Sequence, residues 1–414
     1  MKNIKIGIFG AGRGIDLAKN FILLGCDIVA LCDNRPDRLE KGMKELPSTT
    51  KSYNDFNDFI EQDMDAVVLA NFFHEHTAYA IKCFERGIHV FSECISNGTM
   101  AEGVELVRAF EKSNSIYMLA ENYPQMIFNR EMKRVCDTGT LGKILYAEGE
   151  YNHPVSPYDV EYAQNYKYYE EHWRNHLPTT YYITHSLGPI MCATGATPKK
   201  VTAFSAFAPI DSEYPNASYS GDRASIITTL NDDGSIFRVT GCARFGGHHN
   251  AYRVCGTKGQ IENLRGTETK MLLRYNAWEK PDFVEDAVSY YTPSWNDKDE
   301  ELIKKSGHGG GDFLTAREFI KCIKENKQPE HPFDIYSATV MSSVAILAHR
   351  SVLSDGNSFD IPDFKLEEDR KKYENDRLSP FFSDGVVPSI PCCSHPDYKP
   401  TDEQIKKYFE MLNS

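Results

Sequence analysis

Apolar runs alternate with amphipathic stretches in the N-terminal part of the chain. Residues 4–9 form an apolar run rich in β-branched side chains, and residues 28–32 form a second one. Between the two runs, apolar residues recur three and four positions apart, which is the spacing of one helix face. These helical positions are Ile15, Leu17, Ala18, Phe21, Ile22 and Leu24. The pattern predicts a strand, a helix and a second strand.

A glycine cluster follows the first predicted strand, and an acid follows the second. Gly10, Gly12 and Gly14 flank Arg13, and Asp33 ends the second run. Such glycines let the backbone approach a pyrophosphate, the helix N-terminus supplies N–H groups, and an acid about 20 residues on can accept the ribose hydroxyls. The third glycine comes one position early for the usual spacing, and the alternative is an ordinary glycine turn. The strand, helix, strand and acid in series favour a dinucleotide site. The carboxylate repels a 2′-phosphate, so we expect NAD rather than NADP.

The alternation continues to about residue 122. Strands are predicted at residues 65–70, 88–91 and 116–120, and helices at residues 76–86 and 101–112. This order predicts an α/β Rossmann domain, a doubly wound parallel sheet, over residues 1–122. Its ligand crevice lies at the carboxyl ends of the strands. The residues expected there are Asn71, Glu93, Glu121 and Asn122.

The pattern changes after residue 123. A helix is predicted at residues 128–136, and two more at residues 311–325 and 335–353. Successive strands without intervening helices indicate an antiparallel or mixed sheet. These strands are expected at residues 144–151, 201–208, 223–230, 235–243 and 251–256. Residues 123–364 therefore read as an α+β domain with a large open-faced sheet. The charged and proline-rich residues 365–414 read as a C-terminal arm packed on the body or on a neighbouring subunit.

Composition narrows the classes of partner. The 414 residues exceed what one core usually covers, and the net charge of −13 with a pI of about 5.5 argues against a nucleic-acid or anionic-membrane partner. No run is long enough to span a membrane, and the first strand starts too early for a signal peptide, so we expect a cytoplasmic protein. The 11 cysteines are scattered, which indicates reduced thiols. Adjacent Cys392 and Cys393, near His395, chelate poorly, and no metal site is expected.

The order of these elements resembles the Gfo/Idh/MocA oxidoreductases up to about Phe364. A glycine-rich Rossmann domain, a helix-opening histidine at His76, a strand ending at Glu93 and a large open-faced sheet carry the resemblance. Ordinary dehydrogenases of this family have Glu-Lys-Pro after the fourth strand, and the lysine takes part in proton transfer. Here Cys94 and Ile95 follow Glu93. The resemblance implies a homo-oligomer. The missing lysine argues against simple alcohol oxidation by the family's usual proton transfer.

Four local matches are similar to glycoside hydrolase family 109, the NAD-dependent glycosidases. They are the Glu-Asn-Tyr at 121–123, the Tyr-Asn-His at 151–153, Trp173-Arg174 with Tyr-Ile-Thr-His at 182–185, and Gly-His-Gly-Gly-Gly-Asp-Phe at 307–313 with Ile-Pro-Asp-Phe at 361–364. An ordered series of this kind rarely arises by chance. The resemblance implies a sugar or glycoside substrate and adds His76 and Arg174 as cofactor contacts.

The chemistry implied is a redox route to glycoside cleavage. Oxidising C3 of the sugar to a ketone makes the C2 proton removable, and the C1 substituent can then be eliminated. By resemblance, Tyr151 is the C2 base, while His185 with Tyr182 holds and deprotonates the C3 hydroxyl. His153 assists the leaving group or orients Tyr151. Thr184 and His248 complete the expected substrate contacts. His248 stands near the place of a family tyrosine that touches substrate, so the family's N-acetylgalactosamine preference is not transferred.

Each assignment has a plainer alternative. Tyr151 and His153 share one strand face and could only pack there, and His185 could be a buried, hydrogen-bonded histidine. Glu121 could cap backbone, and Arg174 could form a surface ion pair. A tyrosine with a pKa of about 10 also needs a nearby cation or hydrogen bond to act as a base. Two rival functions stay open, namely a sugar or glycoside 3-dehydrogenase and a non-catalytic NAD-binding sensor.

Overall fold

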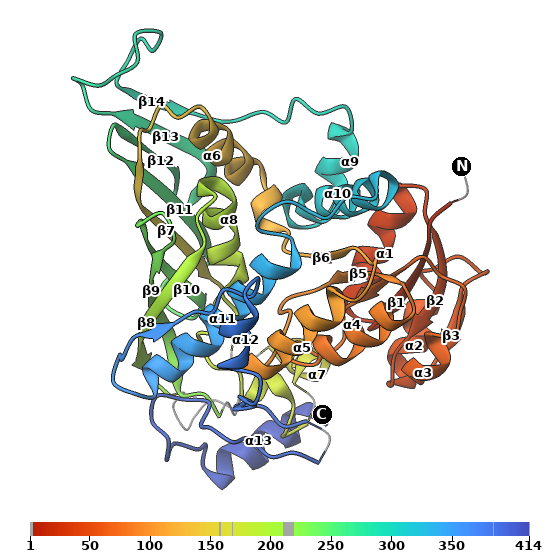
Figure 1. Cartoon of the computed structure of the whole chain (residues 1–414). Helices are drawn as coiled ribbons and strands as arrows, with labels where there is room; N and C mark the ends of the chain where they lie inside the picture. The colour runs from red at the N-terminus through yellow and green to blue at the C-terminus, as the bar shows by residue number, and fades with distance from the viewer. Residues whose placement is uncertain (1–2, 157–158, 168, 210–218, 384, 414) are drawn as a thin grey trace.

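The structure is a computed structural model that describes residues 3–156, 159–167, 169–209, 219–383 and 385–413. Its elements build two sheets with helices between and around them (Figure 1). The first sheet has six parallel strands in the order β3-β2-β1-β4-β5-β6. Its strands are β1 Lys5–Phe9, β2 Asp27–Cys32, β3 Lys51–Tyr53, β4 Ala66–Leu69, β5 His89–Ser92 and β6 Tyr117–Leu119. This order confirms the predicted Rossmann domain.

Helices cover this sheet on both faces. They are α1 Arg13–Leu23, α2 Pro36–Met43, α3 Phe56–Phe59, α4 His76–Glu85 and α5 Met100–Phe110. Helix α5 starts with a capping box, in which Thr99 and Glu102 each accept a backbone N–H of the other. Strand β3 and helices α2 and α3 were not predicted. Strand β3 is three residues long with no buried side chain, so it carries no apolar run for sequence reasoning to detect.

The second sheet has nine strands in the order β14-β13-β12-β11-β7-β10-β9-β8-β15. Only β7 and β10 pair in parallel, which confirms a mixed, mainly antiparallel sheet. The predicted strands are β7 Ile144–Asn152, β8 Pro198–Phe207, β9 Asp222–Asn231, β10 Ile236–Ala243 and β11 His249–Gly256. The unpredicted ones are β12 Gly259–Leu264, β13 Thr267–Tyr275, β14 Val288–Tyr291 and β15 Phe359–Asp360.

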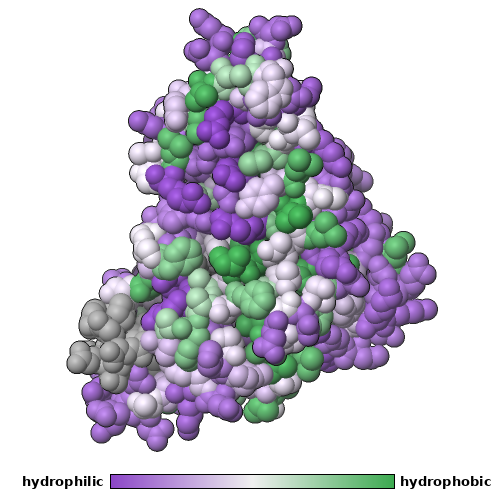
Figure 2. Space-filling view, turned by 90° about the vertical axis from the view of Figure 1, so that its left-hand side faces the viewer, coloured by the Kyte–Doolittle hydropathy of each residue, from purple (hydrophilic) through white to green (hydrophobic). Residues whose placement is uncertain are grey.

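Helices pack on one face of this second sheet only. They are α6 Ile127–Asp137, α8 Thr184–Thr194 and α11 Ile335–Val352 (Figure 1). Figure 2 looks onto the other face, where apolar side chains lie among polar ones. Phe204 on β8 is 64% exposed there, and Leu230 on β9 is 47% exposed. The sheet is therefore open on one side, as the sequence predicted.

Later segments of the chain complete the N-terminal domain. Helix α9 (Glu300–Lys305) and a 3₁₀ turn at His308–Gly310 lead into α10 (Gly311–Glu325). Phe319 of α10 packs against Phe21 of α1 and Phe91 of β5, with ring centroids 6.3 and 5.1 Å apart. The core of the Rossmann domain thus includes a helix that comes almost 200 residues after the boundary set from sequence.

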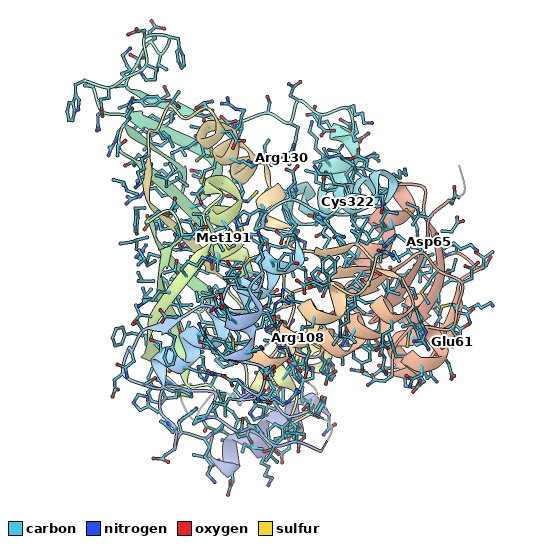
Figure 3. All side chains as sticks on the ribbon, in the orientation of Figure 1. Glu61, Asp65, Arg108, Arg130, Met191 and Cys322 are labelled. Atoms are coloured by element: carbon cyan, nitrogen blue, oxygen red, sulfur yellow. The ribbon has the colours of Figure 1, made fainter. Side chains whose placement is uncertain are left out.

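The C-terminal arm packs on the body of its own chain. It contains α12 (Glu367–Lys371) and α13 (Asp402–Leu412). Arg108 of α5, labelled in Figure 3, forms ion pairs with Glu367 and Glu374 of the arm. Tyr408 of α13 donates a hydrogen bond to the Lys167 carbonyl, just after α7 (Val160–Tyr166). Among the described residues, no helix has the length and apolar character needed to cross a bilayer.

Candidate active site

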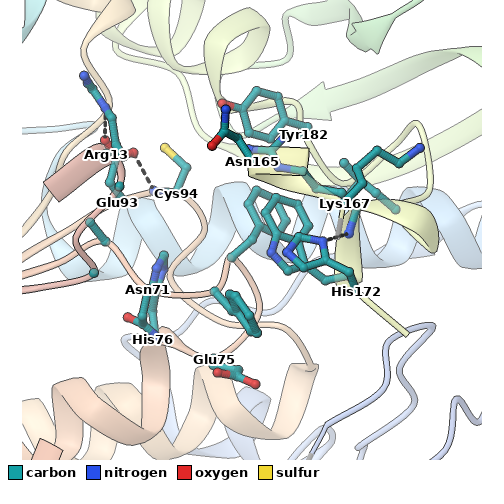
Figure 4. Close-up of a pocket in the computed structure, with 18 of the residues that line it drawn as sticks. Arg13, Asn71, Glu75, His76, Glu93, Cys94, Asn165, Lys167, His172 and Tyr182 are labelled. Atoms are coloured by element: carbon teal, nitrogen blue, oxygen red, sulfur yellow. Dashed lines mark hydrogen bonds and ion pairs between the residues drawn. The ribbon is translucent and has the colours of Figure 1, made fainter. Parts of the chain in front are cut away.

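A cavity of about 720 Å³ lies between the two sheets and is lined by residues of both. Arg13 and Glu93 stand on one side of it, Lys167 and His172 stand on the other, and Asn71 and His76 lie below (Figure 4). Its size suits a small organic ligand together with part of a larger one. The described residues hold no group of three or more His, Cys, Asp or Glu side chains placed to bind a metal ion.

The glycine loop after β1 shapes one end of the cavity. Gly10 has a φ of +104°, and a Cβ there would lie 2.2 Å from the Ala70 carbonyl oxygen, so only glycine fits. Gly12 caps helix α1 without a side-chain hydrogen bond and faces the cavity. Gly14 does not line the cavity. A Cβ at Gly14 would lie 2.7 Å from Ile8, so its role is close packing of α1 on β1.

Asp33 ties this loop to the end of β2. One carboxylate oxygen accepts from the Ala11 N–H at 2.7 Å, and the other accepts from the Arg35 N–H at 2.8 Å. The carboxylate also lines the cavity. Because each carboxylate oxygen has two acceptor sites, both remain able to accept a ribose hydroxyl.

Arg13 is held by two carboxylates from distant parts of the chain. It donates to Glu93 at 2.9 Å and to both oxygens of Asp312, at 2.8 and 2.5 Å. The Asn122 amide donates to the same Asp312. Burial acts to lower the pKa of Arg13, but Glu93 and Asp312 raise it. Burial likewise acts to raise the pKa of Asp312, and Arg13 and His308 hold it far below its usual value. At this end of the cavity, the positive charge of Arg13 is therefore balanced by the two carboxylates.

Several buried polar atoms at this end have no partner among the described residues. They are Nδ2 and Oδ1 of Asn71, Nε2 of His76 and Oδ1 of Asn122. Burying such atoms without a hydrogen bond is costly, so these atoms suit a polar ligand. The glycine loop, the Asp33 carboxylate and these atoms fit a dinucleotide with its pyrophosphate at α1.

His185 forms the centre of the opposite end. It is the second residue of α8, and its Nδ1 lies 2.8 Å from Oε1 of Glu121. Burial acts to raise the pKa of Glu121, but His185 and the Tyr123 N–H hold it below its usual value. The carboxylate is therefore charged and accepts a hydrogen bond from Nδ1–H. That tautomer leaves Nε2 as the acceptor facing the cavity.

Glu121 itself does not touch the cavity. It is fully buried behind His185, and it is absent from the described residues that line the cavity. Its contact with the site runs through His185, and the direct cofactor contact expected from sequence stays a prediction. Stabilising an imidazolium by a buried carboxylate is a recurring arrangement in enzymes that move protons.

Aromatic rings converge on His185. The Tyr182 hydroxyl lies 3.3 Å from Nε2, and the Tyr151 ring lies 4.9 Å away, edge to face. His153 stacks on Tyr151 with centroids 5.6 Å apart, and Tyr123 stacks on His185 at 3.9 Å. Burial raises the pKa of Tyr182, which keeps its hydroxyl protonated as a donor to Nε2. The structure thus brings Tyr151, His153, Tyr182 and His185 together.

Close packing of α8 on β7 creates this convergence. A Cβ at Gly149 of β7 would lie 2.0 Å from the Ser186 carbonyl oxygen, so glycine lets the helix approach the strand. The Tyr252 hydroxyl donates to the His185 carbonyl. Helix α8 begins at Thr184, so Tyr182 lies in the preceding turn rather than on the helix.

Cys94 occupies the place of the family lysine and is buried. Its thiol donates to Oε2 of Glu121 at 3.3 Å, and burial raises the pKa of Cys94 well above its usual value. The thiol is neutral and cannot replace an ammonium group. Cys94 therefore cannot act as the family lysine does, and the tyrosines and histidines around His185 are the candidates for proton transfer.

Of the remaining residues that the sequence proposed for the site, one lines the cavity and two do not. Arg174 lines the cavity and lies over the Trp173 ring, 4.4 Å from its centroid. Thr184 is buried at the start of α8, and His248 is exposed, 4.8 Å from the His153 ring. Neither Thr184 nor His248 belongs to the described residues that line the cavity.

Sequence reasoning missed several residues of the cavity or its wall. These are Tyr123, Lys167, His172, Arg244 and Asp312. Two of them had a signal: Tyr123 belongs to the Glu-Asn-Tyr match at 121–123, and Asp312 follows the glycine-rich loop that opens α10.

Comparison with known proteins agrees with both halves of this architecture. Residues 4–121 match the family model described as the oxidoreductase family with an NAD-binding Rossmann fold. Residues 129–368 match the model described as the glycosyl hydrolase 109 C-terminal domain. The two matches meet close to the boundary between the sheets.

Individual relatives extend over most of the chain. A glycosyl hydrolase family 109 protein from Shewanella pealeana is 26% identical over 398 residues, covering 88% of this chain and 86% of the relative. One from Phocaeicola vulgatus is 24% identical over 405 residues, covering 88% and 84%.

Solved structures share the fold. A levoglucosan dehydrogenase in complex with NADH and levoglucosan superposes with a TM-score of 0.71 at 17% identity, covering 87% of this chain and all of that one. A myo-inositol 2-dehydrogenase from Lactobacillus plantarum gives 0.63 at 18%, with 87% of this chain covered and all of that one. With an NAD-binding Rossmann domain and the glycosyl hydrolase 109 domain over more than half its length, this chain belongs to glycosyl hydrolase family 109 of the Gfo/Idh/MocA oxidoreductases.

Proposed function

We propose that this protein is a redox glycosidase that cleaves a sugar glycoside by transient oxidation at C3. The observation that carries the proposal is the buried Glu121–His185 pair facing Tyr151, in a cavity where Cys94 replaces the usual lysine. NAD held in this cavity would supply the hydride acceptor for C3 and the hydride donor that restores it.

The protein residues supply the proton transfers. His185 Nε2 accepts the proton of the C3 hydroxyl as the ketone forms, and Glu121 stabilises the resulting imidazolium. The Tyr182 hydroxyl, which lies next to Nε2, would hold the C3 hydroxyl of the sugar within reach of that nitrogen. Asn71, His76 and Asn122 are the side chains whose unpartnered atoms would hold the cofactor at the opposite wall.

Tyr151, acting as its phenolate, then removes the C2 proton, and the C1 substituent leaves with its bonding electrons. His153, stacked on Tyr151, is placed to orient Tyr151 or to donate a hydrogen bond to the departing oxygen. Water adds to C1 of the enone and a proton returns to C2, and the bound cofactor would supply the hydride that restores C3. The net reaction is hydrolysis with no change in the oxidation state of the sugar or the cofactor.

A panel of 4-nitrophenyl glycosides tests this proposal. Purified enzyme is incubated with each glycoside, with and without added NAD, and nitrophenol and NADH are followed together. We expect nitrophenol release that needs NAD and leaves no net NADH. NADH accumulating in step with sugar oxidation, with no nitrophenol, would instead identify a dehydrogenase.

We also propose a homo-oligomer that covers the open sheet face. Phe204, Ile226 and Leu230 expose apolar side chains on it, and single-chain proteins seldom expose large contiguous apolar surfaces. Light scattering of the purified protein should give a multiple of the chain mass. Phe204→Glu should shift the mass toward one chain, and a monomeric wild type would contradict this proposal.

A further inference from the structure

The Asn122 side chain is bound by the protein on one side only. It lies just after β6, is 3% exposed and lines the cavity. Its Nδ2 donates to Oδ1 of Asp312 at 2.6 Å, whereas its own Oδ1 is buried and has no partner among the described residues. Because buried polar atoms are nearly always hydrogen-bonded, Oδ1 is an acceptor that a ligand would satisfy.

The carboxylate of Asp312 is used entirely within the protein. An ionised carboxylate offers about four acceptor sites. Arg13 donates to both oxygens, Asn122 donates to Oδ1 and His308 Nδ1 donates to Oδ2. Asp312 is 2% exposed, and it is not among the described residues that line the cavity. It can therefore act on a ligand only through these three partners.

The charge of Asp312 decides which way the Asn122 amide points. Burial acts to raise the pKa of Asp312, but Arg13 and His308 hold it far below its usual value. The carboxylate thus has no proton to donate, and only the NH₂ half of the amide can face it. Turning the amide over would set two acceptors against each other and lose the hydrogen bond. The carbonyl oxygen of Asn122 is therefore held on the side away from Asp312.

Two glycines let the remote Asp312 reach Asn122. Asp312 is the second residue of α10, and a Cβ at Gly311 would lie 2.5 Å from the Asn122 carbonyl oxygen. A Cβ at Gly307 would lie 2.7 Å from Oδ2 of Asp312. Glycine at both positions allows the start of α10 to pack directly against the end of β6.

We propose that Asp312 is a positioning residue for the nicotinamide end of the cofactor. It holds Asn122 so that Oδ1 accepts a hydrogen bond from the carboxamide NH₂ of the nicotinamide. Both chain neighbours of Asn122 contact His185, Glu121 by a hydrogen bond and Tyr123 by stacking. The ring that exchanges a hydride beside His185 would thus lie next to Asn122, and the carboxamide is the N–H donor which that ring carries. The inference rests on the cofactor of the proposed function and not on glycoside cleavage.

Cofactor analogues that differ only in the carboxamide test this contact through binding. Each analogue would displace NADH from the protein, and the loss of NADH fluorescence would give its Kd. The thionicotinamide analogue keeps the NH₂ group, so we expect it to bind about as tightly as NAD. The 3-acetylpyridine analogue replaces NH₂ by a methyl group and leaves Oδ1 unpaired, so we expect it to bind about 10-fold more weakly.

Substitutions separate positioning from a merely structural role. In Asp312→Asn, the new amide can donate to Oδ1 of Asn122, which frees Asn122 to turn its NH₂ toward the acetyl carbonyl. The preference for NAD over the acetylpyridine analogue should then fall to about twofold. Asn122→Ala removes the acceptor and should also abolish the preference, so the test does not depend on Asp312→Asn folding.

Glu93→Gln is the matched control. It removes the other carboxylate bound to Arg13 (Figure 4) and leaves the contact between Asn122 and Asp312 in place. It should change the affinities for NAD and the acetylpyridine analogue alike and keep the preference.

Equal affinity of the wild-type protein for NAD and the acetylpyridine analogue, or no binding of NADH, would overturn the inference. A full preference retained in Asp312→Asn or in Asn122→Ala would also overturn it. The expected preferences in a protein that cleaves no glycoside would leave the role of Asp312 standing and refute the proposed function alone.

Discussion

The two ends of the cavity differ in how their buried charged side chains are paired. At the cofactor end, Arg13 lies between Glu93 and Asp312, and the acids and the base compensate one another. At the opposite end, the buried carboxylate of Glu121 supports His185, which lines the cavity. The charges of the first end compensate one another within the protein, whereas the second end presents a histidine that can change its protonation during a reaction. The predictions below test this difference.

The largest effect is expected at Tyr151. Tyr151→Phe should lower nitrophenol release by about 10²- to 10⁴-fold, because a general base in the right place contributes about that much. One round of NAD reduction by the sugar should persist, since the variant keeps Glu121 and His185. Stopped-flow absorbance would measure both steps. Tyr146→Phe, on the same strand but outside the cavity, is the matched control, and unchanged release in Tyr151→Phe would exclude Tyr151 as the base.

Asp312 tests the compensated end through stability. Asp312→Asn should lower the free energy of unfolding by about 3 kcal/mol near neutral pH, because it leaves Arg13 poorly paired in a buried site. The pKa of Asp312 is held below its unfolded value, so this stabilisation is complete above the usual carboxyl range and declines as pH falls through that range. Urea unfolding of both proteins between neutral and acidic pH would show the difference. A difference that grows toward acidic pH would contradict the account.

A substitution of Glu121 tests whether its negative charge stabilises the protonated form of His185. Glu121→Gln keeps a hydrogen-bond acceptor but removes the charge, so kcat should fall by about 10- to 100-fold with little change in KM. Steady-state kinetics at saturating NAD would measure it. Glu131→Gln on α6, outside the cavity, is the control. A rise in KM for NAD alone would return Glu121 to the direct cofactor contact expected from sequence.

The smallest effect is expected at Asp33. Asp33→Ala should weaken NAD binding about tenfold and reduce the preference over NADP, because the ribose hydroxyls lose their acceptor and a 2′-phosphate loses a repelling charge. Fluorescence titration of both reduced cofactors would measure it. Unchanged selectivity would remove Asp33 from cofactor choice.

The same contrast explains what the sequence could predict. Gly10, Gly12 and Asp33 all belong to one strand–helix–strand unit, so their roles follow from the local order of elements. Tyr151 and His185 could be assigned only through the resemblance, and their contact depends on Gly149 letting α8 approach β7.

Other features of the site depend on contacts between residues far apart in the sequence, which no local sequence pattern predicts. Asp312 meets Arg13 from 299 positions away, and Arg244 reaches the cavity because β10 pairs with β7. Lys167 is buried after a tyrosine-containing helix, with its ammonium group 5.6 Å from the ring centroid of Tyr408 in the distant arm. Strand β3 is too short and too exposed to leave an apolar run.

The central claim is that the C2 proton is removed during a redox-neutral cleavage. Hydrolysis of an accepted glycoside in deuterium oxide, followed by NMR of the released sugar, tests it directly. The account predicts deuterium at C2, none at C3, and no net NADH. Released sugar that retains all its hydrogen at C2 would contradict it.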